Sequence, residues 1–459
     1  MASTADNATP QRPALVLDPR TYDRALSCVH CGLCLPACPT YTTTLHEADS
    51  PRGRIQLMRA LADNAIQPTE SVVRHLDLCL DCRGCETACP SGVVYHELIE
   101  ETRHRMAATR AMSTQERLLR WVFLNVFTQP TRLKAALLPA RILQKIGVYG
   151  LLRKAGVMRL LPAGFRKMEQ MLPPDGPLWP RPLRSVLQIR DPRSAIRDLR
   201  VGFFTGCIGS VMFADVNRKA AELLAAAGAQ VIIPPTQNCC GAIHHHNGAV
   251  EPSIDLARRN IDAFLPEDSP PVDAIVTAIA GCGAMLHEYD HLLRDDVKYA
   301  ARAREFSRRV KDISVVLLEL GLPKMEHRID AVATYHDACH LAHAQKVVDA
   351  PRTLLAQIPG LKLVPLMDSD MCCGAAGTYN LTQPEMSLQL ADRKLDHIAA
   401  TGASICVTGN VGCAMQIQSH AAARGRRLRV AHPVELLHEA VFAPQGPSAA
   451  KDLAPRVRT

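Results

Sequence analysis

The sequence of 459 residues lacks the features that place many proteins in a class at once. Its start, MASTADNATPQRPALVLDPR, contains no apolar h-region of a secretory signal, and no uninterrupted apolar run reaches the roughly 18 residues of a membrane-span candidate. From these two absences we expect a protein that is made and kept in the cytoplasm. In addition, no G-x-G-x-x-G motif follows a plausible strand, so the chain carries no recognisable flavin or nicotinamide fingerprint.

A strong excess of charge of one sign is also missing. Lys and Arg number 53 against 45 Asp and Glu, and the net charge of +8 is weak evidence for nucleic-acid binding in a chain of this length. The hydrophobic content of 47% and the charged content of 21% are ordinary for a globular protein, and the length predicts about three domains. We expect sizeable cores and no nucleic-acid partner.

Cysteine, by contrast, is abundant. The chain has 17 cysteines, and a disulfide framework is not expected in the reducing cytoplasm. Metal binding and redox chemistry are the remaining explanations for so many thiols.

Eight of the cysteines form two runs of the pattern C-x2-C-x2-C-x3-C-P, which read CVHCGLCLPACPTY from Cys28 and CLDCRGCETACPSGV from Cys79. Such short spacings let one loop wrap a cube of iron and sulfide, and the fourth cysteine of each run usually serves the other cluster. One [4Fe–4S] cluster is therefore assigned to Cys28, Cys31, Cys34 and Cys89. The other is assigned to Cys79, Cys82, Cys85 and Cys38.

The alternative interpretation of these runs is a pair of zinc knuckles, because C-x2-C alone is common in zinc sites. Zinc needs four ligands and has no use for a repeated eight-thiolate pattern, so iron–sulfur clusters are favoured. The text between the runs, PRGRIQLMRALADN, has apolar residues at helical spacing. A domain of this kind conducts electrons singly and does not by itself oxidise an organic substrate.

A basic segment follows the two runs. Residues 117–168 contain eleven Lys or Arg and no Asp or Glu, and apolar residues recur at helical spacing with breaks expected near Pro130 and Pro139. A basic amphipathic helix carrying Trp121, Phe123 and Phe127 is suited to a membrane interface. The other interpretation is helices that pack on the protein itself or on a partner. Residues 171–183 are proline-rich and predict a linker.

The C-terminal half contains an internal repeat. LRVGFFTGCIGS matches AVATYHDACHLAH, AQVIIPPTQNCCGAI matches LKLVPLMDSDMCCGAAG, and VDAIVTAIAGCGAML matches ASICVTGNVGCAMQI. The matching cysteines of the three pairs are 132, 133 and 131 residues apart. This near-constant offset indicates a duplicated domain with pseudo-twofold organisation.

Each copy alternates short β-branched runs with helical segments, which predicts parallel α/β units with the cysteines at the carboxyl ends of strands. The predicted fold class is a multidomain α+β protein with four parts. They are a helical two-cluster domain at 18–112, a basic helical segment with a linker at 113–183, a first repeat at 199–325 and a second at 330–442. The candidate additional metal ligands are Cys207, Cys239, Cys240 and Cys282 in one copy and Cys339, Cys372, Cys373 and Cys413 in the other.

These motifs carry a family resemblance. The two cysteine runs resemble the helical ferredoxin module of succinate dehydrogenase and heterodisulfide reductase subunits, and the tandem CCG patterns resemble heterodisulfide reductase B-type subunits. The whole architecture, from about residue 20 to 440, is similar to that of glycolate oxidase iron–sulfur subunits. The text SPRGRIQLMR, NCCGAIHHHNG, YHDACHLAHAQ and TGNVGCAMQI favours that family.

The resemblance implies a subunit that transfers electrons within a 2-hydroxy-acid dehydrogenase complex, most simply a glycolate oxidase that converts glycolate to glyoxylate. It implies a separate FAD-binding flavoprotein as partner, a quinone or other electron acceptor, and peripheral contact with the cytoplasmic face of the inner membrane. The chain alone is not expected to be catalytic. Alternatives are a lactate or glycerol-3-phosphate dehydrogenase subunit, a thiol reductase like heterodisulfide reductase, or a non-redox anchor with structural metal.

One departure from the CCG pattern bears on the metal content of the repeats. The full pattern ends in C-x2-C, but Ile279 and Asn410 stand where the first cysteine of that pair is expected. Four thiolates per copy still suffice for a cluster or a zinc ion. Unmetallated pockets and a vicinal redox dithiol are the alternatives.

Several other residues near the repeat cysteines have candidate roles. The histidines after the first CCG are candidates for a metal ligand or a proton donor to a quinone, and three residues beside Cys339 are candidates for orienting its thiolate. Cys406 lies outside the repeat pattern and is expected to be a small buried hydrophobe. The first group consists of His244, His245 and His246, and the second of His336, Asp337 and His340.

Overall fold

The structure is a computed structural model that describes residues 15, 17–107, 112–161, 163–172, 176–187, 199–268 and 270–442. The chain divides into two compact units, residues 1–111 and residues 112–459, and each is described by itself. The polar start of the sequence lies outside the described residues, as do residues 173–175 of the predicted linker.

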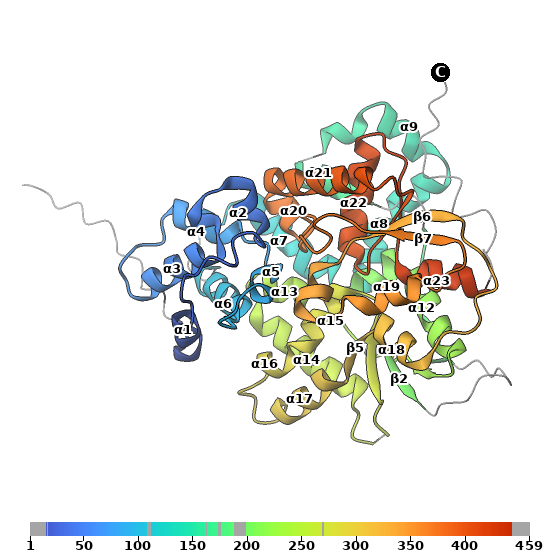
Figure 1. Ribbon diagram of the computed structural model, residues 1–459, viewed down its shortest axis with the longest axis horizontal. Helices are drawn as coiled ribbons and strands as arrows, with labels where there is room; N and C mark the ends of the chain where they lie inside the picture. Colours follow the sequence, from blue (N-terminus) through green and yellow to red (C-terminus); the bar gives the residue numbers. More distant parts are fainter. Residues whose placement is uncertain are drawn as a thin grey trace, which may run out of the picture. The chain divides into compact units, whose positions relative to one another are not determined.

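Every regular element of the N-terminal unit within residues 17–107 is a helix (Figure 1). The helices are α1 (Pro19–Leu26), α2 (Pro39–Thr44), η1 (Glu47–Asp49), α3 (Pro51–Ala62), α4 (Glu70–Asp77), α5 (Gly84–Thr87) and α6 (Tyr95–Ala107). The helix expected between the cysteine runs is α3, which begins at Pro51 because the Ser50 side chain accepts a hydrogen bond from the amide of Gly53. Its apolar face packs against α4 and α6 in a small core that also contains Cys79 and Cys85.

The basic segment opens the second unit and is helical. Its elements are α7 (Thr114–Val122), a π-helix η2 (Phe123–Phe127), α8 (Pro130–Lys145), α9 (Val148–Lys154), η3 (Val157–Leu160) and α10 (Ala163–Gln170). The expected break near Pro130 is the start of α8, but the break expected at Pro139 is wrong. A proline removes only one helical hydrogen bond, and the helix continues through it to Lys145.

No single helix in the described part of the chain has the length and hydropathy to cross a membrane. Pro130–Lys145 and Val148–Lys154 meet the length and composition criteria only as a pair, which is bent by 89°.

The rest of the unit contains two sheets with the same strand order. The first sheet runs β1-β3-β2-β4-β5 and the second β7-β6-β8-β9, and all pairings are parallel except the antiparallel edge strand β1. The strands of the first are β1 (Val186–Leu187), β2 (Arg200–Phe204), β3 (Gln230–Ile232), β4 (Ala274–Thr277) and β5 (Val310–Asp312). Those of the second are β6 (Ala331–Tyr335), β7 (Leu361–Val364), β8 (Ile405–Val407) and β9 (Arg429–Ala431). The duplicated parallel α/β architecture predicted from the sequence is thereby confirmed.

Helices surround both sheets. In the first repeat they are α11 (Cys207–Met212), α12 (Ala214–Ala226), α13 (Ala242–His246), α14 (Val250–Phe264), α15 (Ala280–His287), α16 (Tyr289–Leu292), α17 (Ala300–Arg309) and α18 (Ile313–Leu320). In the second they are the π-helix η4 (His340–Ala344), α19 (Asp349–Leu355), α20 (Tyr379–Thr382), α21 (Pro384–Ala400), α22 (Val411–Ala423) and α23 (Pro433–Phe442).

The two repeats share a hydrophobic core. α12 of the first repeat packs on α23 of the second, and α19 of the second packs on α18 of the first. Leu223, Leu317, Leu355 and Leu437 from these four helices belong to a single buried cluster, and His438 Nε2 lies 2.8 Å from a carboxylate oxygen of Glu222. Each repeat therefore completes the core of the other through the same pair of surfaces.

Candidate metal centres

The two cysteine runs of the N-terminal unit fold into equivalent loops. In each, the residue before the second cysteine and the residue after it have positive φ: His30 and Gly32 in the first run, Asp81 and Arg83 in the second. Gly32 suits this conformation, because a Cβ there would lie 2.9 Å from the Arg52 guanidinium. The other three residues adopt a sparsely populated backbone conformation, as is common in loops that present ligands.

The fourth cysteine of the first run lies beside the cysteines of the second. Burial, followed by the thiolates of Cys82 and Cys79 and that of Cys38, raises the pKa of the Cys85 thiol. Cys38, Cys79 and Cys85 are buried, whereas Cys31 is exposed. Cys89, the fourth cysteine of the second run, is half-buried against the same small core.

Burial keeps these thiols protonated unless a cation is bound. Burial raises the pKa of Cys34 to about 11, so its thiol would stay protonated at neutral pH without a nearby positive charge. Iron or zinc binds the thiolate and displaces the proton, which turns the same burial into an environment that retains the metal. The converging thiols fit a metal centre better than free cysteines.

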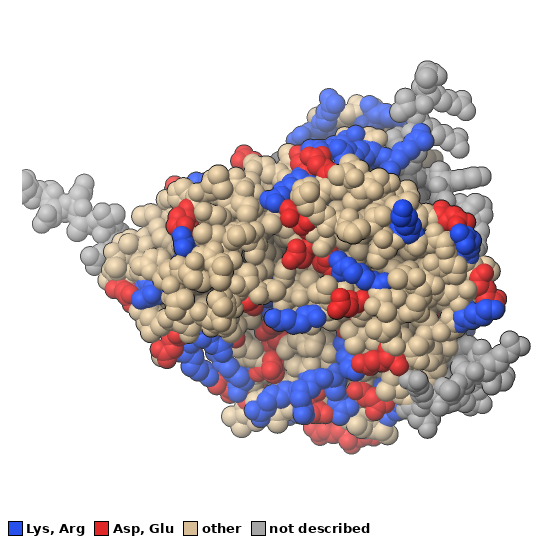
Figure 2. Space-filling view, in the orientation of Figure 1, with Lys and Arg blue, Asp and Glu red and all other residues tan. Residues whose placement is uncertain are grey.

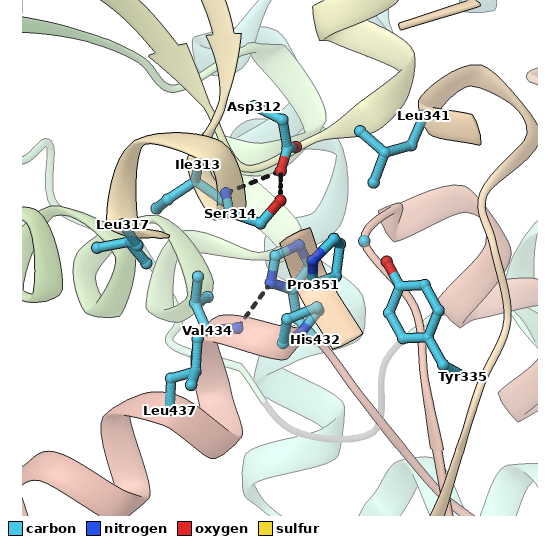
Figure 3. A pocket seen from close by; sticks show the side chains of 12 residues that line it. Asp312, Ile313, Ser314, Leu317, Tyr335, Leu341, Pro351, His432, Val434 and Leu437 are labelled. Atoms are coloured by element: carbon cyan, nitrogen blue, oxygen red, sulfur yellow. Dashed lines mark hydrogen bonds between the residues drawn. The ribbon is translucent and has the colours of Figure 1, made fainter. Parts of the chain in front are cut away.

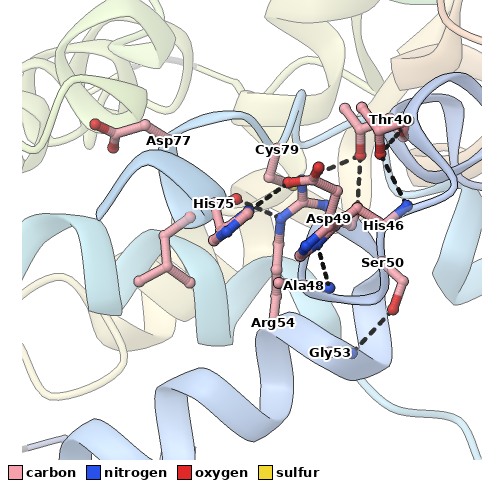
Figure 4. Close-up of polar contacts among 12 residues, drawn as sticks. Thr40, His46, Ala48, Asp49, Ser50, Gly53, Arg54, His75, Asp77 and Cys79 are labelled. Atoms are coloured by element: carbon pink, nitrogen blue, oxygen red, sulfur yellow. Dashed lines mark hydrogen bonds and ion pairs between the residues drawn. The ribbon is translucent and has the colours of Figure 1, made fainter. Parts of the chain in front are cut away.

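A buried arginine lies beside this site and was not predicted from the sequence (Figure 4). The Arg54 side chain is 1% exposed, and its guanidinium donates to the carbonyl of His75 at 2.7 Å and to Thr40 Oγ1 at 3.1 Å. The thiolates of Cys79 and Cys38 raise the pKa of Arg54, which places its positive charge close to both sulfurs.

The carboxylate that accompanies Arg54 is Asp49. Its Oδ1 lies 2.8 Å from His75 Nδ1 and 3.9 Å from the Arg54 guanidinium, and the carboxylate is 2% exposed. The rings of His46 and His75 stack at 5.0 Å, and their nitrogens lie within 4.8 Å of the Asp49 carboxylate (Figure 4). Because Asp49 already pairs with His75 and Arg54, we assign the cluster to the polar support of the cysteines.

In the first repeat the four candidate cysteines converge at the carboxyl ends of strands. Cys207 follows β2, the adjacent pair follows β3 and Cys282 follows β4. Cys207 Sγ lies 3.4 Å from Cys239 Sγ, and the amide of Gly241 donates to Cys239 Sγ at 3.5 Å. Hydrogen bonds from Cys239 and Cys282 lower the pKa of Cys240, which is the central thiol of the group.

The second repeat repeats this arrangement. Hydrogen bonds from Cys372 and Cys413 lower the pKa of Cys373, and a hydrogen bond from Cys372 lowers that of Cys339. All four cysteines are buried. The predicted sets of four are thus each brought together, although their members are widely separated in sequence.

The two residues that replace the expected fifth cysteine occupy equivalent places. Ile279 is the N-cap of α15 and Asn410 is the N-cap of α22. Asn410 Nδ2 donates to Cys413 Sγ at 3.5 Å, while its Oδ1 accepts from the amide of Gly281 in the other repeat at 3.4 Å. Asn410 therefore supports a thiol and links the repeats without supplying a thiolate.

The histidines flanking the cysteines have different surroundings. His340 Nδ1 lies 3.4 Å from Cys339 Sγ, in agreement with an orienting role, and its ring lies 5.9 Å from that of His246 in the other repeat. Asp337 instead forms a bidentate ion pair with Arg352, with both oxygens at 2.6 Å. Orientation of Cys339 by Asp337 is therefore not observed, because its carboxylate is already engaged.

His336 also departs from the predicted role. Its ring faces Cys373 and Cys413 rather than Cys339, because it leaves the end of β6 directed at the other two sulfurs. Of the preceding histidines, His244 is buried in α13 beside Leu124, and burial lowers its pKa. Cys406 is buried in β8 and burial raises its pKa to about 12, as expected of a small core residue.

A small cavity lies between the repeats (Figure 3). Its volume of about 10 Å³ matches roughly one water molecule, and its polar lining residues are Asp312, Ser314, Tyr335 and His432. Burial raises the pKa of Asp312 to about 6 and lowers that of His432 to about 4. These groups belong to the junction between the two repeats.

Comparison with known families gives three matches along the chain. The family described as "4Fe-4S dicluster domain" matches residues 24–93, and "Glycolate oxidase iron-sulfur subunit, linker region" matches residues 115–172. "Cysteine-rich domain" matches twice, at residues 201–287 and 333–418. Together with the convergence of the cysteines, these matches assign iron–sulfur clusters as the cofactors.

Curated relatives match nearly the whole chain. The probable glycolate oxidase iron-sulfur subunit of Bacillus subtilis is 41% identical over 90% of this chain and 94% of its own length. The glycolate oxidase iron-sulfur subunit of Escherichia coli is 34% identical over the same shares. Lactate utilization protein A of Shouchella clausii is 32% identical but covers 52% of this chain and 99% of its own.

A solved structure is similar at the level of the fold. The crystal structure of a hypothetical protein from Helicobacter pylori superposes with a TM-score of 0.53 at 9% identity, covering 93% of this chain and 73% of that one.

Proposed function

The chain belongs to the family of glycolate oxidase iron–sulfur subunits, and from this premise we propose that it conducts electrons from a partner flavoprotein to a quinone or another acceptor. The observation that carries the proposal is the pair of equivalent cysteine loops in the N-terminal unit, joined to a sequence without a dinucleotide fingerprint. When bound there, [4Fe–4S] clusters supply one-electron transfer.

The proposed ligands of the N-terminal unit are crossed between the runs. Cys38 is proposed to serve the centre of Cys79, Cys82 and Cys85, and its burial beside Cys85 and Arg54 supports this. Cys28, Cys31, Cys34 and Cys89 are proposed to hold the other. Because Cys31 is exposed, the centre that it is proposed to bind is the more accessible of the two to an incoming electron.

Substrate oxidation is proposed to occur in a partner. Hydride removal from a 2-hydroxy acid such as glycolate needs a two-electron cofactor, and an FAD-binding flavoprotein subunit would supply it. On this proposal the chain contributes thiolate ligands and their polar support, and is not catalytic by itself.

The test is a reconstitution. The isolated chain, prepared anaerobically, is expected to show the broad visible absorbance of iron–sulfur centres, no bound flavin, and no dye reduction with glycolate. Adding the flavoprotein should permit glycolate-dependent bleaching, and Cys82→Ser should block the bleaching while flavin reduction continues. Glycolate oxidation by the flavin-free chain alone would refute the division of labour.

A lactate dehydrogenase complex is the second candidate, because relatives named lactate utilization protein A match this chain over 52% of its length. The two near-full-length relatives carry the glycolate name and favour glycolate. Assaying the purified complex with a panel of 2-hydroxy acids separates these substrates. About eight irons per chain would instead indicate ferredoxin-type clusters only, with the cysteine-rich half as an anchor that binds zinc or no metal, whereas about twelve to sixteen would indicate iron in the repeats.

Peripheral membrane contact is proposed for the basic segment. Ile146 is 62% exposed, Leu151 67% and Leu160 85%, and exposed Lys145, Lys154 and Arg159 lie among them. Figure 2 shows Lys and Arg gathered over the region where Figure 1 places α9. Exposed apolar side chains with exposed cations near them suit an anionic lipid surface.

The structure refines which side chains of the basic segment would serve that contact. Phe123 is buried and packs edge-on against the half-buried Phe127, so the ring of Phe123 is not available for the insertion expected from the sequence. Lys134 donates to the carbonyl of Pro180 at 2.7 Å and Arg141 is buried, which removes them from the proposed contact. Trp121 remains exposed.

Flotation with anionic liposomes tests this contact. Changing Ile146 and Leu160 together to Asp is expected to weaken binding about 100-fold, because two apolar side chains contribute about 3 kcal/mol. Val297→Asp, at a still more exposed apolar position in the first repeat, is the control. Unchanged liposome binding of the double variant would favour the other interpretation, in which the segment packs on the protein itself or on a partner protein.

A further inference from the structure

The two cysteine-rich repeats differ at one position beside their cysteines. His336 precedes Cys339 by three residues, and the residue three before Cys207 is Phe204. Both positions lie at the carboxyl end of equivalent central strands, because Phe204 ends β2 and His336 follows the last residue of β6. One repeat therefore presents an imidazole where the other presents a hydrocarbon ring.

One hydrogen bond of His336 fixes which tautomer a neutral ring adopts. The side chain is fully buried, and Nδ1 lies 3.0 Å from the carbonyl oxygen of Ser369. A carbonyl accepts but does not donate, so Nδ1 carries a proton, and a neutral ring then has its lone pair on Nε2. Metal-binding histidines are held in the same way, with the second nitrogen donating to a carbonyl or carboxylate.

Nε2 of His336 points at thiols. Within the described part of the chain it has no nitrogen or oxygen partner, although it is fully buried, and an interaction with His336 contributes to the lowered pKa of Cys373. It lies with the sulfurs of Cys373 and Cys413 in a group whose ligand atoms are all within 4.8 Å of one another. A buried nitrogen lone pair left unpaired costs free energy unless something binds it, and the neighbouring sulfurs define where that would be.

Phe204 offers nothing comparable in the first repeat. It is fully buried and its ring packs at 5.9 Å from that of Phe264. Near Gly206 the edge of the Phe204 ring and Cys282 Sγ lie close to the same point, so the ring occupies the place beside the thiols. The first site is limited to thiolate ligands.

We propose that His336 is a metal ligand, so that the second repeat holds its iron–sulfur or zinc centre through Nε2 together with Cys373 and Cys413, whereas the first repeat uses thiolates alone. The proposal rests on metal occupancy of the cysteine-rich repeats. His336 supplies a donor in the repeat whose expected fifth cysteine is replaced by Asn410.

A second difference acts in the same direction. Lys394 is buried beside Cys372 and Cys373 and donates to the carbonyl of Asp368. Ser253 and Ser387 pack on the equivalent glycines of the two CCG motifs, so these two serines correspond to each other. The residue seven positions after the serine is Asn260 in the first repeat and Lys394 in the second. A neutral imidazole in place of a thiolate, together with a nearby ammonium, makes the second site more positive than the first and raises its reduction potential.

The experiment uses the full chain, prepared anaerobically with ¹⁵N-labelled histidine. Variants are His336→Phe, which copies the first repeat, His336→Cys, which restores a ligand, and His343→Phe as a control at another buried histidine of this repeat. Metal content is measured for each, with Cys373→Ser marking what the second repeat holds. Directly bound nitrogen is detected by pulsed EPR for reduced iron centres or by X-ray absorption for zinc.

The expected result is a bound-nitrogen signal in the wild type and in His343→Phe that disappears in His336→Phe together with the metal of the second repeat. His336→Cys should regain that metal without the nitrogen signal. The proposal is overturned if the signal survives in His336→Phe, or if the wild type lacks it while Cys373→Ser shows that the repeat is occupied. If Cys373→Ser loses no metal, the second repeat is empty and this inference fails, while the electron-transfer function of the N-terminal unit stands.

Discussion

The N-terminal unit and the cysteine-rich half solve the same problem of gathering thiols in opposite ways. In the N-terminal unit the ligands come from two short loops, and Cys79 and Cys85 are themselves part of a small core. In the cysteine-rich half the ligands of each site come from the ends of three strands. The core that the two repeats share contains none of them, whereas a separate cluster in each repeat contains Cys207, Cys239 and Cys240 or Cys373 and Cys413.

From this difference we expect the two units to differ in the order of folding and metal binding. Loops that bury their own ligands depend on the bound metal for much of their stability. Sheets with an independent core assemble the thiols first and present a finished site.

Removal of all metal should produce the largest difference in stability between the two units. Structural metal contributes on the order of 10 kcal/mol in small metal-dependent domains, so the apo N-terminal unit should unfold while the repeats stay folded. Limited proteolysis after anaerobic chelation should cleave within residues 17–107 and spare residues 199–442. Equal resistance of both regions would remove the proposed contrast.

Replacing Cys38 by Ser tests how the two loops are connected. About four irons should be lost, from the centre of Cys79, Cys82 and Cys85, because Cys38 lies on that side of the unit. Low-temperature EPR of the reduced chain identifies the missing centre, and Cys406→Ala serves as a buried cysteine control. Loss of the centre at Cys28, Cys31 and Cys34 alone would show that the ligation is not crossed.

Arg54 should set the potential of the same centre. Arg54→Gln removes a buried positive charge beside Cys38 and Cys79 and should lower the midpoint potential. A change of about 1.4 kcal/mol corresponds to about 59 mV for one electron. Redox titration followed by EPR measures the shift, and Arg74→Gln at an exposed site of α4 is the control. An unshifted potential in folded Arg54→Gln would assign the residue to packing alone.

The cavity between the repeats should give the smallest effect, since its two titrating groups oppose each other. Asp312 binds its proton more tightly in the folded state, so its contribution to stability grows as the pH falls from about 6 to 4. His432 resists protonation when folded, so its contribution is lost as the pH falls from about 6.5 to 4.

Single variants should expose the two contributions separately. Asp312→Asn should steepen the loss of stability on acidification, and His432→Asn should flatten or reverse it, each by at most about 1.4 kcal/mol per pH unit. Thermal unfolding between about pH 4.5 and 6.5 measures both. Parallel pH profiles of the two variants would contradict the assignment.

The sequence allowed local features to be predicted better than distant ones. The cysteine runs act within short loops, and the repeated offsets of the CCG cysteines predict two equivalent sheets, since spacing alone defines them. The polar residues that support the N-terminal cysteines were not predicted from the sequence, because Asp49, Arg54 and His75 meet only after three helices have packed. His336 was a candidate from its place beside Cys339, but the sulfurs that it faces, those of Cys373 and Cys413, depend on the end of β6.

Because α12 packs on α23 and α19 packs on α18, the two repeats of the C-terminal half are related like the subunits of a twofold dimer, although they belong to one chain. A single repeat produced alone would expose the apolar sides of two helices and would pair with a second copy through them. Joining the copies covalently frees each to change without the other. A homodimer would have to place the same residue in both sites, whereas the fused pair keeps a histidine in one and a phenylalanine in the other.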